Sequence, residues 1–284
     1  MKSWWKKLPK WLTLVAILIA IPSLTFAGTI VSGKVSGNIP LDPAWKGWVS
    51  AKPVTLILAP QKIAKPYNLA PSINQVTVRT LNNGTDIAFL IEWKDKTKDS
   101  LPKEVSFSDA CAVQIPVTAD PSVPYYMGES KKPVMIMHWK AVWDEGVVDV
   151  PKLYPNVQID WYPEGDKGFN TVEGWRHGKR YIVGYAANNP ISTPTHPNGA
   201  EELMAEGFGT LTTSTVQNTK AKAVRTKEGW KVLLIRPFKG TGENNPNWGT
   251  GKTTYVNFAI WDGGSSERGS RKGIVPEWQT LQIQ

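Results

Sequence analysis

The chain has 284 residues with a formal net charge of +9 at pH 7, which falls to +5 without the four lysines of its first 27 residues. This mild charge, without any basic run, argues against nucleic-acid binding. The only cysteine is Cys111, which excludes an intramolecular disulfide, a thiolate metal cluster and the paired-cysteine attachment of a c-type haem. We expect Cys111 to be a small buried apolar residue.

Residues 1–27 have the pattern of an export signal. Four lysines at positions 2, 6, 7 and 10 precede an apolar run at residues 11–24, and Ala27 closes a small-x-small cleavage site. The run is shorter than the roughly 20 residues of a membrane span. We therefore expect an exported chain in the periplasm or an equivalent compartment. An uncleaved N-terminal anchor is the alternative.

Short strand-like segments separated by turn signals follow in chain order. Asn83-Gly84 predicts a hairpin between two of them, and residues 199–205 alone have a helical pattern. With 22 prolines and 24 glycines, the pattern favours an all-β fold, a single immunoglobulin-like β-sandwich over residues 28–284 with long loops. The expected strands are residues 76–81, 86–93, 110–117, 134–143, 157–162, 181–187, 209–215, 221–225, 230–237 and 254–261.

Motifs for catalysis are scarce. The three histidines have no metal-ligand spacing, and no nucleophile elbow or phosphate-binding loop is present. The acidic pairs Asp144-Glu145 and Glu201-Glu202 are interpreted as solvated turns. Eleven tryptophans lie outside the first 27 residues, a number typical of sandwiches that bind sugars or enclose a flat cofactor. A binding protein is favoured over a catalyst.

Met127 lies beside Gly128 on a loop that leads into the expected strand at 134–143. A methionine held on such a loop can present its thioether to a bound group, although methionine also fills gaps in cores. In the strand, Val134, Ile136 and His138 share one face because side chains alternate.

Several segments together resemble the haem b-binding gamma subunits of the ethylbenzene dehydrogenase family, which serve periplasmic molybdenum enzymes of the type II dimethyl-sulfoxide-reductase group. No single segment is specific, but their order along residues 76–284 is that of the family. The resemblance implies a sandwich that holds one non-covalent haem b. The matching segments are residues 107–116, 126–128, 133–134, 138–141, 205–212, 222–224, 229–237, 256–263 and 267–268.

The resemblance also implies the axial ligands of the haem iron. Met127 stands at the position of the family's methionine ligand, and Lys222 at the expected position of its lysine ligand. A thioether suits Fe(II), whereas an amine binds iron only after losing its proton. Lys220 and Lys231 are the competing lysines. His138 or His177 is the next candidate if none of the three ligates.

Haem propionates need cationic or hydrogen-bonding neighbours, and His138, Arg176 and Arg236 are the candidates for that role. With both axial positions filled by protein, the haem would transfer electrons and not bind substrate. The resemblance thus implies no catalytic residue on this chain.

The implied partners are an iron–sulfur beta subunit, a molybdenum-containing alpha subunit and a soluble or membrane cytochrome. Among relatives, the nitrite oxidoreductase gamma subunit looks most similar, while nitrate, selenate, chlorate and dimethyl-sulfide enzymes use the same kind of subunit. The rival interpretation is a tryptophan-rich carbohydrate-binding sandwich without haem.

Overall fold

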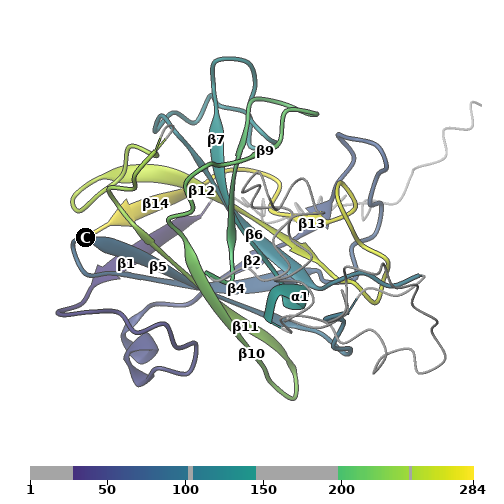
Figure 1. Ribbon diagram of the computed structural model, residues 1–284, viewed down its shortest axis with the longest axis horizontal. Helices are drawn as coiled ribbons and strands as arrows, with labels where there is room; N and C mark the ends of the chain where they lie inside the picture. The colour runs from purple at the N-terminus through teal and green to yellow at the C-terminus, as the bar shows by residue number, and fades with distance from the viewer. Residues whose placement is uncertain (1–27, 102–104, 145–197, 243–244) are drawn as a thin grey trace, which may run out of the picture.

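The computed structural model describes residues 28–101, 105–144, 198–242 and 245–284 (Figure 1). The regular elements among these residues are almost all β-strands, as expected, and no helix among them is long and apolar enough to cross a membrane. The elements are β1 (Thr29–Lys34), η1 (Lys46–Ser50), β2 (Val54–Ile57), β3 (Ala59–Pro60), β4 (Gln75–Asn82), β5 (Asp86–Lys94), β6 (Ala110–Pro116), β7 (Val134–Lys140), α1 (Ala141–Asp144), β8 (Glu201–Ala205), β9 (Thr212–Thr213), β10 (Lys220–Arg225), β11 (Gly229–Pro237), β12 (Thr253–Trp261), β13 (Gly273–Ile274) and β14 (Gln279–Ile283).

The strands form two packed layers. The first layer has the order β10-β11-β5-β4, with β2 beside β4, and its β10–β11 hairpin is green in Figure 1. The second layer has the order β14-β12-β6-β7-β8-β9, with β13 beside β12. Strand β1 joins the layers, because its first part pairs in parallel with β14 and its end pairs with β4. The expected β-sandwich is confirmed.

A hydrophobic core fills the space between the layers. Trp93 and Trp230 of the first layer meet Trp139 of the second, with ring centroids 6.2 and 5.1 Å from it. Such edge-to-face contacts add about 0.5–1.5 kcal/mol each beyond the area buried. Cys111 is fully buried here, as predicted.

The predicted turn at Asn83-Gly84 is confirmed. Gly84 has φ of +90°, and the Asn83 side chain accepts hydrogen bonds from the backbone N–H groups of Thr85 and Asp86. The turn fixes the register of β4 against β5.

The helix predicted at residues 199–205 is wrong. Its alanine, glutamate and leucine residues favour a helix in isolation, but the segment is strand β8, which pairs with β7 over five residues. Glu201 and Glu202 are 7% and 2% exposed, so the prediction of a solvated turn there is also wrong. Both carboxylates have partners: Thr213 donates to Glu201, while Thr219 and Arg236 donate to Glu202.

Other expected boundaries differ modestly. Strand β7 ends at Lys140 and is followed by the single turn of α1, and the strand expected at 209–215 is reduced to β9. The export signal, the strands expected at 157–162 and 181–187, and Glu145 lie outside the described residues.

Candidate functional site

The second layer carries an apolar outer face, the side of its strands that points away from the core. Side chains that alternate with core residues on β6, β7, β8, β12 and β13 build this face. Its buried members are Ala110, Ala112, Val123, Val134, Ile136, Leu203, Ala205, Ala259, Trp261, Ile274 and Trp278, with Tyr125, Met127 and Tyr255 partly buried against them.

Alanines occupy the middle of the outer face. Ala112 on β6 pairs with Ala259 on β12, and Ala110 pairs with Trp261. Methyl side chains keep the floor low, while Trp261, Ile136 and Ile274 rise at its sides. These side chains are 3–9% exposed, so the middle of the outer face is a largely buried apolar surface.

Met127 lies on the loop that crosses one end of this face. The Gln114 side chain donates a hydrogen bond to the Tyr125 carbonyl at 2.6 Å, and the Gly207 N–H donates to the Met127 carbonyl at 2.8 Å. Met127 has φ of +83°, which is uncommon for a residue with a side chain. Such strain persists only where the surroundings enforce it, and it concentrates at functional positions.

Gly128 is required next to it. It has φ of +68°, and a Cβ there would lie 2.5 Å from the carbonyl oxygen of Lys132 and 3.2 Å from that of Ala205. No side chain fits this gap, so glycine lets the loop approach β8 and fixes the position of Met127.

Lys272 brings an amine to the same outer face. It immediately precedes β13, the strand that pairs with β12, and lies two residues before Ile274 of the outer face. Its Nζ lies 5.1 Å from the centre of the Trp261 ring, and no ion pair of Lys272 is found among the described residues. Burial lowers the pKa of this amine to about 8.

His138 is half-buried on the outer face as well, as its alternation with Ile136 predicts. Its ring centroid is 5.3 Å from that of Trp261 and 5.5 Å from that of Trp143. His138, Trp261 and Lys272 thus form one cluster at the end of the face away from Val134.

Lys222 lies elsewhere. It is exposed on β10, between Ala221 and Ala223, which pack into the core, and its cross-strand neighbour Leu233 belongs to the outer side of the first layer. Met127 is on the outer side of the second layer. Met127 and Lys222 therefore lie on the outer sides of different layers.

The competing lysines are also on the first layer. Lys220 is exposed at the start of β10, and Lys231 on β11 forms an ion pair with Glu92 at 2.7 Å. Neither lies on the outer face that holds Met127.

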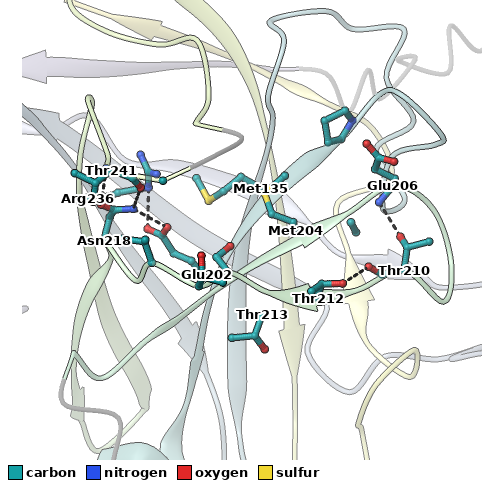
Figure 2. A pocket seen from close by; sticks show the side chains of 16 residues that line it. Met135, Glu202, Met204, Glu206, Thr210, Thr212, Thr213, Asn218, Arg236 and Thr241 are labelled. Carbon is teal, nitrogen blue, oxygen red and sulfur yellow. Dashed lines mark hydrogen bonds and ion pairs between the residues drawn. The ribbon is translucent and has the colours of Figure 1, made fainter. Parts of the chain in front are cut away.

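Arg236 lines a separate cavity of about 460 Å³, within the size range of small-molecule pockets. Figure 2 shows Arg236, Glu202, Met135 and Met204 among the side chains that line this cavity. The guanidinium is fully engaged: its Nε donates to Glu202 at 2.8 Å, and its other nitrogens donate to Asn245 and the Pro237 carbonyl. Threonines dominate the wall, which includes no lysine or histidine among the described residues.

Arg176 and His177 lie outside the described residues. The sequence reasoning missed Lys272, although a signal was present. Lys272 comes just after the matching segment at residues 267–268, and it alternates with Ile274 next to a buried strand.

The outer face therefore combines a thioether on a strained loop with an amine of lowered pKa. Both are ligand types for haem iron, and the apolar floor between suits a macrocycle. Met127 and Lys272 are thus the side chains of this face whose donor types suit a haem iron.

The family model described as ethylbenzene dehydrogenase matches residues 45–273, most of the chain, including β6, β7, β8 and β12. The chain belongs to the ethylbenzene dehydrogenase family. The match includes Met127 and Lys272.

Two curated relatives resemble the chain at low identity. The chlorate reductase subunit gamma of Ideonella dechloratans is 25% identical over 68% of this chain, and the chain spans only 58% of that protein's length. A Haloferax mediterranei protein named as a respiratory nitrate reductase haem subunit is 23% identical over 96% of this chain and 84% of its own length.

Among solved structures, a family 9 carbohydrate-binding module from Caldicellulosiruptor kristjanssonii, in complex with glucose, aligns over 90% of this chain and 95% of its own. The TM-score is 0.43 and the identity 10%. The tryptophans of the described residues are buried or half-buried, so they offer no exposed platform for a sugar ring.

Proposed function

We propose that this chain is the haem b-binding, electron-transfer subunit of an exported molybdenum oxidoreductase complex. Family membership and the names of two relatives, a chlorate reductase gamma subunit and a nitrate reductase haem subunit, support the proposal. The observation that carries it is the outer face, where a strained methionine and a desolvated lysine share one apolar surface.

Met127 and Lys272 are the proposed axial ligands, with Lys272 in place of Lys222. An amine ligates iron only when neutral, and a pKa near 8 leaves roughly a tenth of the Lys272 amine neutral at pH 7. An exposed lysine with an ordinary pKa near 10.4 is neutral in less than about one molecule in a thousand. The position of Lys272 on the outer face thus lowers the free-energy cost of deprotonating its amine, which must be neutral to bind iron.

The bound haem supplies one-electron redox chemistry. Met127 contributes a soft thioether, which tends to raise the reduction potential. With both axial positions taken by side chains, no position is open for substrate, and the alanine floor and Trp261 keep water away. The residues thus favour electron transfer over catalysis.

The proposed partners are an iron–sulfur subunit, a molybdenum-containing subunit and an external cytochrome. The proposed location is the periplasm or an equivalent compartment, following removal of residues 1–27. A nitrite oxidoreductase-type complex remains the favoured parent, with chlorate and nitrate enzymes supported by the named relatives.

The visible spectrum of the purified chain, with a pyridine haemochrome assay, tests this proposal. We expect a red protein with one haem b per chain and sharp low-spin bands. A colourless protein that instead binds oligosaccharides on an affinity gel would contradict the proposal and support the carbohydrate-binding rival.

A further inference from the structure

Three buried aspartates meet at one end of the sandwich, beside the ends of β5 and β12 and the start of β6. Asp95 follows β5, Asp109 precedes β6 and Asp262 follows β12. One carboxylate oxygen from each lies within 4.8 Å of the others, and the residues are 5%, 0% and 8% exposed. Three carboxylates this close and this buried repel one another unless something offsets their charge.

Asp109 is held as an acceptor. Its Oδ1 accepts from the Gly263 N–H at 2.9 Å, and its Oδ2 accepts from the Asp99 N–H and the Trp230 Nε1–H, both at 2.9 Å. Three N–H donors favour the ionised carboxylate, while burial raises its pKa to about 7. The hydrogen bonds therefore favour the charged form of the Asp109 carboxyl, whereas its burial disfavours that form.

Asp95 has an unsatisfied oxygen. Its Oδ1 accepts from the Thr97 N–H, but its Oδ2 is buried and has no hydrogen-bond partner. The Oδ2 of Asp99 is likewise buried without a partner. Orphaned carboxylate oxygens are rare in interiors, and an absent ion is one explanation for them.

The free oxygen of Asp99 faces the cluster across Gly264. A Cβ at Gly264 would lie 2.7 Å from Asp99 Oδ2, 2.7 Å from the Thr97 hydroxyl and 3.3 Å from Asp262 Oδ1. Only glycine leaves this space open, so oxygens from three side chains border the same small volume.

Within the described ranges, Arg225 offsets the charge of the cluster only in part, because the pKa of Asp95 stays raised although Arg225 lowers it. Arg225 is nearby, but its Nη2 donates to the backbone carbonyls of Asp95 and Thr97 at 2.9 Å, and no salt bridge joins a lysine or arginine to the three carboxylates. Desolvation and the neighbouring Asp262 carboxylate raise the pKa of Asp95. A divalent cation would offset both the cost of burying these carboxylates and the repulsion between them.

We propose that Asp95, Asp109 and Asp262 bind one calcium ion. The donors are all oxygens, which selects a hard cation. Asp95, Thr97 and Asp99 place side-chain oxygens at alternate positions, as the first, third and fifth residues of calcium-binding loops do. Calcium accepts such irregular sets of six to eight oxygens, whereas magnesium demands near-ideal octahedral geometry.

The ion would tie the two layers together. Strand β5 belongs to the first layer, while β6 and β12 belong to the second, so the ligands come from both sides of the core. Trp230 of β11 already bridges the layers through Asp109. The proposed ion therefore has a structural role, because its ligands close one end of the sandwich.

Thermal unfolding of the full chain, first treated with EDTA and then titrated with CaCl₂, tests the site. At a calcium concentration of about one hundred times Kd, the expected rise in Tm is on the order of 5–10 °C. MgCl₂ at the same concentration should raise Tm by much less. Elemental analysis after dialysis against calcium should give one ion per chain.

Asp95→Asn should abolish the calcium-dependent rise in Tm, whereas Glu228→Gln, on a side chain that is 77% exposed, should keep it in full. Calcium absent from wild type by elemental analysis, or a full rise in Asp95→Asn, would overturn the site and favour protonated carboxyls instead. If Asp95→Asn does not fold, the elemental analysis of wild type decides alone.

Discussion

The positive φ of Met127 is a main reason for proposing this residue as a haem ligand. Gly128 can be tested directly, because Gly128→Ala would force a Cβ to within 2.5 Å of the Lys132 carbonyl oxygen and displace the loop. We expect a loss of unfolding free energy above about 2 kcal/mol, measured by urea denaturation, with a changed haem spectrum.

Gly37→Ala is the matched control. Gly37 also has positive φ, +79°, but a Cβ at this position would meet no atom within 4 Å, so only backbone strain is added. We expect a cost of about 1 kcal/mol and an unchanged spectrum. Equal effects of the two variants on the spectrum would argue against the role of Gly128 in placing Met127.

The amine of Lys272 makes the stability of the haem-free chain depend on pH. Its folded pKa of about 8 lies below the ordinary value of 10.5, so the unfolded chain binds more protons between these pH values. The free energy of unfolding therefore rises with pH across this window, and the penalty is fully present below pH 8.

Lys272→Met removes that penalty. Urea denaturation of haem-free protein should show the variant more stable than wild type at pH 7, with the difference shrinking as pH approaches 10.5. A difference that is constant with pH would show that the amine is not desolvated.

At the scale of elements, the buried ion pair between β8 and β11 can be tested by substitution. Arg236 and Glu202 have side chains 2% and 3% exposed, with Nε and Oε1 2.8 Å apart. Arg236→Met leaves Glu202 as an unpaired buried charge and should cost about 3–5 kcal/mol in urea denaturation. Lys94→Met, which breaks the exposed pair with Glu228, should leave stability near wild type.

The same pair explains why β8 was not predictable from sequence. Ala-Glu-Glu-Leu-Met-Ala favours a helix locally, and only the pairing with β7 and the distant Arg236 make it a strand. Strands with clear alternation or a turn signal, such as β4 and β5 around Gly84, were predictable because their information is local.

The residues of the candidate site likewise include some that could be predicted from the sequence and some that could not. Met127 could be selected from its loop, and the face of His138 from alternation, but the choice of lysine depends on which side of which layer each strand presents. Lys222 lies between two alanines in sequence, and Lys272 lies two residues before Ile274. Only the register of β10 on the first layer and of β13 on the second separates them.

For the whole molecule, the haem should be removable without breaking a covalent bond. Cys111 is fully buried in the core and burial raises its thiol pKa, so it is unsuited to forming a thioether with haem. Acid–acetone treatment should move all colour into the organic phase, read from the spectrum of both phases. Colour that stays with the polypeptide would contradict the proposed haem b.

We propose that Met127 and Lys272, which lie at opposite ends of the second layer's outer face, hold one haem. The most direct test compares the visible and electron paramagnetic resonance spectra of Met127→Ala, Lys272→Ala and Lys222→Ala. We predict that the first two lose the low-spin spectrum of wild type, while Lys222→Ala and the core variant Met137→Ala keep it. A normal low-spin spectrum in Lys272→Ala, with loss in Lys222→Ala, would contradict the account and return the ligand to the first layer.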